Sequence, residues 1–281
     1  MHHAVQRMTG STRQTEDRLL GKVDQTLMYW NWLAKNSSPG WLSSASHLDL
    51  GAGWLPSVPL AFYALGTPRQ YLVDLRQHME PEAVVNTVKL FRAAAPHARG
   101  KFARLPAVPD SGQTLEATLE PFGMTYAAPY DDLVRQIGGK VGYVTATHMF
   151  CHLSRPTLVA VLRSVHKLLE PGGYILAQQH LRQLFDGLDC PTPFVALRFS
   201  DWFWENIINS DTMSYNRLKV RDYREALEES GFEVCLLDVE PGTPEDFEKL
   251  SRARIHPMFS KFTREELAAR HLFLVGRKPL E

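Results

Sequence analysis

Apolar residues are spaced along most of the chain so that strand-like runs alternate with helix-like segments. Residues 14–36 repeat apolar side chains on one helical face, and Asn36–Gly40 breaks that pattern. The strand-like runs follow at residues 46–50, 71–74, 124–128, 141–150, 174–177, 232–239 and 271–275. Strands that alternate with helices indicate a mostly parallel sheet with right-handed crossovers and helices on both faces. In such α/β folds, ligands bind outside the carboxyl ends of the strands.

Several helix ends carry their own chemical signals. Pro56 opens an apolar helical run that Gly66 ends, and proline near the start with glycine past the end is the expected asymmetry. Ser154 is placed to cap the helix after the fourth strand, and Thr263–Glu266 reads as a capping box. These helix-end signals support the predicted alternation of strands and helices in addition to the hydrophobic spacing.

The alternation predicts one principal domain at residues 46–281, preceded by a helical cap at residues 1–45. It is interrupted at residues 182–220, a stretch too long for an ordinary connection between a strand and a helix. This stretch is rich in aromatic residues, and we expect it to form an insert over the strand ends that serves as a substrate lid. A small satellite core beneath a long loop is an equally good interpretation of the same residues.

Composition and charge limit the classes of molecule that the protein is expected to bind. The 281 residues have a formal net charge of zero, which argues against a protein that binds nucleic acid by neutralising many phosphates. No apolar stretch is long enough to span a membrane, and the N-terminus lacks the apolar region of a secretory signal. The three cysteines are far apart and odd in number, as in reduced cytosolic proteins. We therefore expect a cytoplasmic protein that acts on a small molecule, and the sequence leaves its oligomeric state open.

A glycine turn follows the first strand. Asp49-Leu-Gly51-Ala-Gly53 stands at that strand's carboxyl end, and Asp74 ends the second strand 21 residues beyond Gly53. Glycines permit a tight turn whose backbone N–H groups approach a ligand, and an acidic residue at the next strand end accepts hydrogen bonds from ribose hydroxyls. The simpler interpretation is a plain strand-to-helix turn beside a strand-end cap.

The combination of motifs resembles the class I S-adenosylmethionine (SAM)-dependent methyltransferases. The resemblance covers residues 46–279 and is carried by Leu48–Gly53, Asp74, Thr147–Leu153 and Leu168–Gly173. It implies a Rossmann-like sheet whose last strand is antiparallel, with variable substrate-recognition elements at the N-terminal cap and the insert. One position departs from the family pattern, because Leu55 stands where a third glycine is usual.

The resemblance also implies the cofactor contacts. Gly51 and Gly53 approach the amino-acid end of SAM, Asp49 orients the loop or the amino group, and Asp74 holds the ribose. Asp131, with Asp132 as the close competitor, meets the adenine amino group. The implied set for SAM and its product S-adenosylhomocysteine (SAH) is Asp49, Gly51, Ala52, Gly53, Asp74, Asp131, Thr147 and His148.

Three histidines stand at predicted strand ends and are candidates for a base. Methyl transfer to a hydroxyl group requires alignment of the acceptor and removal of its proton, and histidine suits that task near neutral pH. His180, after the fifth strand, is the first candidate, followed by His148 and His152. Each is alternatively a hydrogen-bonded structural residue. The spacing of His148 and His152 would suit half of a metal site, but no third ligand is evident and we expect no metal.

Three functions fit these features. The first is a small-molecule methyltransferase, with oxygen as the preferred acceptor because the motif typical of nitrogen methylation is missing after the fourth strand, where Thr147–Phe150 stands. The second is a protein with the SAM fold that binds SAM without methylating, as a rearrangement catalyst or binding partner. The third is a nicotinamide-dependent oxidoreductase, whose fingerprint fails at Pro56.

Overall fold

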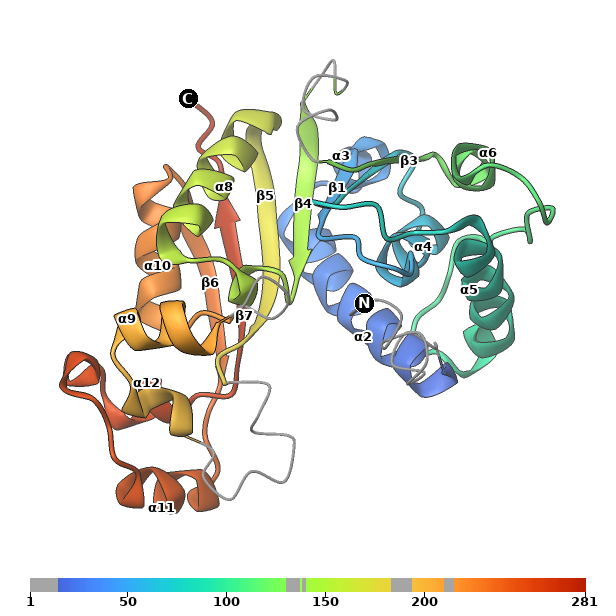
Figure 1. Ribbon diagram of the computed structural model, residues 1–281. Helices are drawn as coiled ribbons and strands as arrows, with labels where there is room; N and C mark the ends of the chain where they lie inside the picture. Colours follow the sequence, from blue (N-terminus) through green and yellow to red (C-terminus); the bar gives the residue numbers. More distant parts are fainter. Residues whose placement is uncertain (1–14, 130–136, 138–139, 183–193, 210–214) are drawn as a thin grey trace. The chain divides into compact units, whose positions relative to one another are not determined.

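The computed structural model describes residues 15–129, 137, 140–182, 194–209 and 215–281. The strands form one seven-stranded sheet in the order β3-β2-β1-β4-β5-β7-β6. The chain divides into two units, residues 1–145 and 146–281, and each is considered by itself (Figure 1). The predicted fold class, a mostly parallel sheet with an antiparallel last strand and surrounding helices, is confirmed.

Unit 1 contains the parallel strands of the cofactor half. Its strands are β1 (His47–Leu50), β2 (Gln70–Val73), β3 (Met124–Ala127) and most of β4 (Val141–Thr147). β1 pairs in parallel with β2, and β2 pairs in parallel with β3, so their carboxyl ends lie at one edge. The helices are α2 (Glu16–Asn36), α3 (Pro39–Ser44), α4 (Ser57–Leu65), α5 (Pro81–Ala94) and α6 (Leu115–Leu119), with short turns η1 (Ala95–His97) and η2 (Glu120–Phe122).

Helices α2, α4, α5 and α6 of unit 1 share one apolar core. Leu19 and Val23 of α2 pack in the same cluster as Leu60 of α4 and Val88 of α5. The N-terminal helical segment is therefore present as predicted, and it is packed rather than isolated. Gly66 ends α4 with a φ of 119°, the left-handed conformation that favours glycine at a helix end.

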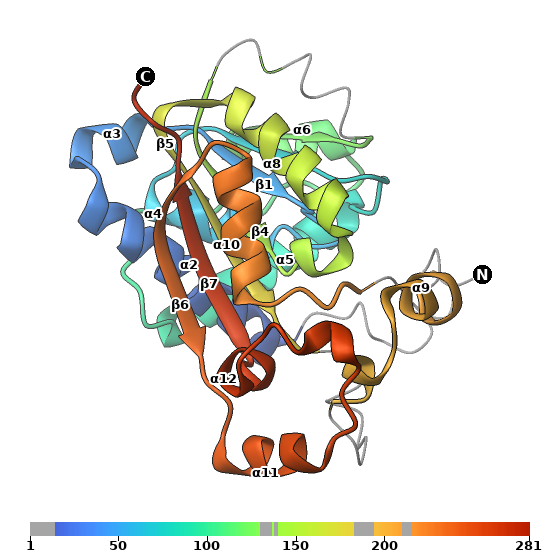
Figure 2. The ribbon, with the colours of Figure 1, turned by 90° about the vertical axis from the view of Figure 1, so that its left-hand side faces the viewer.

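Unit 2 contains the antiparallel end of the sheet. Its strands are β5 (Leu169–His180), β6 (Glu233–Glu240) and β7 (His271–Arg277), and β7 pairs in antiparallel fashion with both neighbours. Helices α8 and α10 lie side by side over these strands (Figure 2). The helices are α8 (Arg155–Leu168), α9 (Asp201–Phe203), α10 (Val220–Glu229), α11 (Pro244–Arg252) and α12 (Arg264–Ala268), with short turns η3 (Phe150–His152), η5 (Val195–Arg198), η6 (Trp204–Ile208) and η7 (Pro257–Phe259).

Predicted caps form in unit 2. The Ser154 hydroxyl accepts a hydrogen bond from the backbone of Thr157, and Thr263 forms a capping box with Glu266. None of the described helices is both long and apolar enough to cross a lipid bilayer.

Strand β5 is longer than the sequence pattern indicated. The pattern predicted a strand that starts at Tyr174, after the Pro171–Gly173 sequence, but β5 starts at Leu169. The backbone N–H of Gly172 donates to the Lys278 carbonyl, and the Lys278 N–H donates to the Gly173 carbonyl. The segment after β7 thus pairs with the Pro-Gly-Gly sequence and extends the strand, a long-range contact that local turn propensity does not contain.

Candidate functional site

The glycine turn after β1 is fastened to the end of β2. Gly51 and Gly53 have φ values of 74° and 65°, which a residue with a side chain rarely adopts. The backbone N–H groups of Gly51 and Ala52 both donate to the Val73 carbonyl, at 2.9 and 3.1 Å. The Gly53 N–H donates to Asp74 Oδ2 at 2.9 Å. The motif and the acidic residue that the sequence paired by spacing are therefore in direct contact.

Asp74 keeps acceptor capacity for a ligand. Its Oδ1 accepts a hydrogen bond from the Leu75 N–H at 2.7 Å, so each carboxylate oxygen uses one lone pair within the protein. The Leu75 side chain beside it is 75% exposed. A carboxylate next to an exposed apolar side chain suits a ribose attached to a flat apolar ring.

Asp49 is the most deeply buried acid of the turn. Its side chain is only 5% exposed, and a 2.8 Å hydrogen bond joins Oδ1 to Oγ1 of Thr145 on β4. Its Oδ2 has no hydrogen-bond partner among the described residues. Burial raises the pKa of Asp49 to about 7, against the opposing effects of Thr145 and of the Lys22 charge.

A buried histidine, also in unit 1, continues the hydrogen-bonded contact between Asp49 and Thr145. His47 Nε2 lies 2.7 Å from Thr145 Oγ1, and His47 Nδ1 lies 2.9 Å from Gln70 Oε1. The Gln70 amide donates to the Pro59 carbonyl at 2.9 Å. The His47 ring also stacks on Tyr143, and burial lowers its pKa to about 3. We call Asp49, Thr145, His47 and Gln70 the buried polar chain.

Helix α2 adds a cation that the sequence reasoning missed. The Lys22 ammonium donates to Gln25 Oε1 at 3.2 Å, burial lowers its pKa, and its charge acts on Asp49. Helical spacing alone offered one signal, because Lys22 is followed by the inward-facing Val23 and Thr26. His47 gave no such signal, because an apolar strand pattern does not reveal a polar partner 98 residues away.

Unit 2 brings two of the three predicted bases together. The rings of His148, just after β4, and His180, at the end of β5, stack with centroids 4.0 Å apart and planes 12° apart. His148 has a φ of 55°, a strained conformation for a residue with a side chain. His271, at the start of β7, faces His180 in register, with ring centroids 4.6 Å apart. We call His148, His180 and His271 the histidine row.

His271 was missed by sequence reasoning, although a signal existed. An antiparallel last strand starts at the edge where parallel strands end, so its first residue belongs to the site. His271 Nδ1 and Glu240 Oε2 are 2.6 Å apart, and Arg270 pairs with the same carboxylate at 3.1 Å. The hydrogen bond with His271 is the main reason that the pKa of Glu240 lies below its usual value. This carboxylate orients the imidazole of His271.

The remaining predicted residues have different outcomes. His152 lies outside the histidine row, and its ring packs against that of Tyr215, with the two ring centroids 4.5 Å apart. Thr147 is the last residue of β4 and is half-buried. Asp131 and Asp132 lie outside the described residues. Within the described ranges, no group of three or more His, Cys, Asp and Glu side chains could hold a metal ion.

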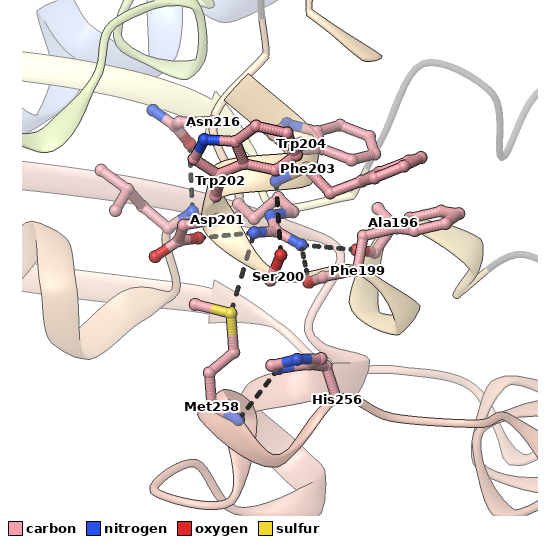
Figure 3. A network of polar contacts seen from close by, with 12 residues as sticks. Ala196, Phe199, Ser200, Asp201, Trp202, Phe203, Trp204, Asn216, His256 and Met258 are labelled. Atoms are coloured by element: carbon pink, nitrogen blue, oxygen red, sulfur yellow. Dashed lines mark hydrogen bonds and ion pairs between the residues drawn. The ribbon is translucent and has the colours of Figure 1, made fainter. Parts of the chain in front are cut away.

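The described part of the predicted insert is organised around Arg217. Its guanidinium is 4% exposed and donates to the Ala196 and Phe199 carbonyls and to Asp201 (Figure 3). The face of Trp204 lies 5.1 Å from the guanidinium carbon. A cavity of about 660 Å³ adjoins this network, with Trp204, Tyr215, Phe259 and Phe262 among its lining residues. Phe194 of the insert packs in a small core with Phe259 and Phe262, whereas Trp204 and Tyr215 of the insert line the cavity.

Comparison with known proteins gives a family. Residues 32–237 match the family described as "Methyltransferase domain". No protein of curated function matches the sequence.

Solved structures give distant likenesses. Magnesium protoporphyrin IX methyltransferase from Synechocystis PCC 6803, with bound SAH, is 14% identical, with coverage of 93% of this chain and 84% of that chain and a TM-score of 0.47. A SAM-dependent methyltransferase from Methanosarcina mazei is 11% identical, with coverage of 85% and 94% and a TM-score of 0.46. The cyclase SpnF is 14% identical, with coverage of 85% and 76% and a TM-score of 0.44.

Proposed function

The chain belongs to the class I SAM-dependent methyltransferase family, and we propose that it transfers a methyl group from SAM to a hydroxyl group of a small molecule. The cofactor of the family is SAM. This membership removes the nicotinamide-dependent oxidoreductase from the three candidate functions. The observation that carries the proposal is the glycine turn, whose Gly53 N–H is hydrogen-bonded to Asp74.

The residues of unit 1 fit the cofactor. The Oδ2 atom of Asp49, without a partner in the described structure, suits the ammonium group of an amino acid. The Lys22 ammonium, whose charge acts on Asp49, suits the carboxylate of the same amino acid. Asp74 has lone pairs for the ribose hydroxyls, and the exposed Leu75 offers apolar surface for the adenine. Gly51, Ala52 and Gly53 provide the close backbone approach.

Thr147, His148 and Asp131 complete the proposed cofactor contacts. Thr147 ends β4 and His148 follows it, at the carboxyl edge where a ligand of this fold binds. The strained backbone of His148 is a feature that clusters at functional sites. Asp131 is proposed from the family resemblance alone.

A histidine base is proposed for the chemical step. Bound SAM supplies a methyl group on a positively charged sulfur, so the protein's main tasks are to align the acceptor and move its proton. His180 is our first candidate, because it is solvent-exposed at the end of β5 and lies between two further imidazoles. His148 and His152 are the next candidates. The Glu240 carboxylate, which orients His271, supports this proton chemistry from the far end of the row.

The insert is proposed as the recognition element for the acceptor. Asn216 donates side-chain hydrogen bonds to the Phe150 and Leu153 carbonyls, so the end of the insert lies against the segment that follows β4. The cavity beside it has the volume of a drug-sized ligand site and an aromatic wall. Residues 182–220 of the proposed domain 46–281 would then act as a lid over an apolar acceptor that carries a hydroxyl group.

The test has two stages. Isothermal titration calorimetry with SAM, SAH and NAD should show binding of the first two and none of the third, and lack of SAM and SAH binding would refute the proposal. Transfer of a labelled methyl group from SAM to a panel of small alcohols and phenols then measures activity. Labelled product from amines alone would refute the preference for oxygen. SAM binding with no transfer to any acceptor class would favour a protein that binds SAM without methylating.

A further inference from the structure

The donors and acceptors of the buried polar chain limit which of its atoms carry protons. The Pro59 carbonyl is only an acceptor, so the Gln70 amide nitrogen faces it and Gln70 Oε1 faces His47. Because that oxygen also only accepts, His47 Nδ1 carries a proton. The next two contacts share a single hydroxyl proton, because Thr145 Oγ1 lies 2.7 Å from His47 Nε2 and 2.8 Å from Asp49 Oδ1.

Only two proton arrangements satisfy every contact of the chain. In the first, His47 is neutral, the Thr145 hydroxyl donates to its Nε2, and Asp49 is a protonated acid that donates to Thr145. In the second, His47 carries two protons, Nε2 donates to Thr145, and Thr145 donates to an ionised Asp49. A neutral His47 with an ionised Asp49 leaves two acceptors facing each other at one contact, which is unfavourable in a buried site unless a cation beside the carboxylate compensates for the lost hydrogen bond.

The surroundings favour the first arrangement. His47 is fully buried between the rings of Phe62 and Tyr143, where its hydrogen-bond partners among the described residues are the neutral Gln70 and Thr145 and an imidazolium would be poorly solvated. The charged groups that act on Asp49 are the Lys22 ammonium from α2 and the Asp74 carboxylate after β2, and they have opposite signs. Burial raises the pKa of Asp49 to about 7 and lowers that of His47 to about 3.

We propose that Asp49 of the ligand-free protein is a neutral acid held by Thr145, His47 and Gln70, and that binding of the amino-acid end of the cofactor expels its proton to solvent. This inference rests on the proposed function, because it takes the ammonium of SAM or SAH to lie at Asp49 Oδ2. A positive charge at that oxygen favours the carboxylate. His47 is then a positioning residue, which acts on the cofactor through Thr145 and Asp49.

The proton makes cofactor affinity depend on pH. If one proton must leave before the ammonium binds, the dissociation constant of SAH rises about tenfold for each pH unit below the pKa of the acid. Affinity should be about tenfold weaker near pH 6 than near pH 8.5, and level above that.

Calorimetry with SAH tests proton release directly. Titrations near pH 6, in buffers with different ionisation enthalpies, should show close to one proton released per SAH bound, and titrations near pH 8.5 should show almost none. Binding without proton exchange at both pH values would overturn the inference and leave the proposed function standing. Lack of SAH binding at both pH values would refute the proposed function.

A second measurement needs no ligand. The side-chain carboxyl carbon of Asp49, followed by NMR in the ligand-free protein, should titrate with a midpoint near the pKa of about 7 given above. The imidazole nitrogens of His47 should show a neutral ring protonated at Nδ1 throughout. A carboxyl midpoint below about 5, within the ordinary range for aspartate, or a doubly protonated His47 would overturn the inference.

Two variants and a matched control complete the design. Asp49→Asn keeps a donor for Thr145 but carries no titrating proton, so its SAH affinity should not change between pH 6 and 8.5. His47→Phe frees the Thr145 hydroxyl to donate to Asp49, so the midpoint of Asp49 should fall. Tyr143→Phe removes the neighbouring buried hydrogen bond to Thr67, outside the chain, and should keep the wild-type proton release. Equal midpoints in His47→Phe and Tyr143→Phe would show that the chain does not hold the proton.

Discussion

The buried polar chain of unit 1 and the histidine row of unit 2 both contain histidine, but they differ in what surrounds it. His47 has no exposed surface, and hydrogen bonds bind both of its ring nitrogens. His180 is exposed, and its ring packs against the imidazole rings of His148 and His271. Burial therefore holds the pKa of His47 low at β1, whereas the His180 ring at the end of β5 is open to solvent. Substitutions should change stability and binding in the first region and turnover in the second.

The largest expected effect tests the histidine row. His180→Ala should lower turnover by roughly 10²–10⁴-fold, because an acceptor hydroxyl loses the group that takes its proton. SAH affinity should stay near the wild-type value, as measured by calorimetry. Steady-state rates at saturating SAM and acceptor provide the comparison, with His148→Ala and His152→Ala beside it. If all three variants keep wild-type turnover, none of His180, His148 and His152 takes part in proton transfer.

The next effect concerns stability as a function of pH. The pKa of Asp49 is about 7 in the folded protein, against about 3.9 for an unfolded chain. Between these values the unfolded chain has lost a proton that the folded protein retains. The wild-type free energy of unfolding should therefore fall as pH rises, by up to about 1.4 kcal/mol per pH unit from this group, and the contribution should be level above pH 7.

Asp49→Asn removes that decline. In urea unfolding at a series of pH values from 4 to 8, the variant should gain stability relative to wild type as pH rises. The difference should stop growing near pH 7. Parallel curves for the two proteins would mean that Asp49 is ionised in both the folded and the unfolded state.

A smaller effect is expected for cofactor binding at the glycine turn. Asp74→Ala removes an acceptor of ribose hydroxyls and of the Gly53 N–H, so SAH binding should weaken by roughly 1–3 kcal/mol. Turnover at saturating SAM should change much less. Asp74→Asn is the control, because it retains one oxygen for Gly53. Wild-type affinity in the alanine variant would place the ribose elsewhere.

The smallest effect compares one substitution in each region. Gln70→Met leaves the His47 Nδ1 proton and the Pro59 carbonyl without partners in a fully buried site, which should reduce the free energy of unfolding by about 2 kcal/mol. Glu240→Gln removes a half-exposed carboxylate that pairs with His271 and Arg270, and should cost under about 0.5 kcal/mol. Urea unfolding at pH 7 measures both, and equal losses would contradict the contrast between the regions.

Much of the fold could be predicted from sequence because its signals are local. The caps at Ser154 and Thr263, the helix stop at Gly66 and the glycine turn are each encoded within a few residues. The start of β5 could not be predicted, because it depends on pairing with Lys278.

The residues of the candidate site also differ in whether a local sequence pattern reveals them. Asp74 was identified by its spacing from the turn, and His148 and His180 by their places at strand ends. The role of Asp49 could be stated only as a family expectation, because its partner Thr145 is 96 residues away and its environment depends on the packing of α2. Contacts of this kind arise when the chain folds, and no local pattern records them.

The hydrogen bonds of Asp74 have a consequence for the rate at which a ligand is captured. Both oxygens hold backbone groups, of Gly53 on one side and Leu75 on the other, so the turn is ordered before any nucleoside arrives. Fixing the backbone of one residue costs about 1–2 kcal/mol, and here that cost is met during folding. Association at this turn then needs no slow rearrangement of the loop, and affinity there is governed by how long the nucleoside stays rather than by how often it enters.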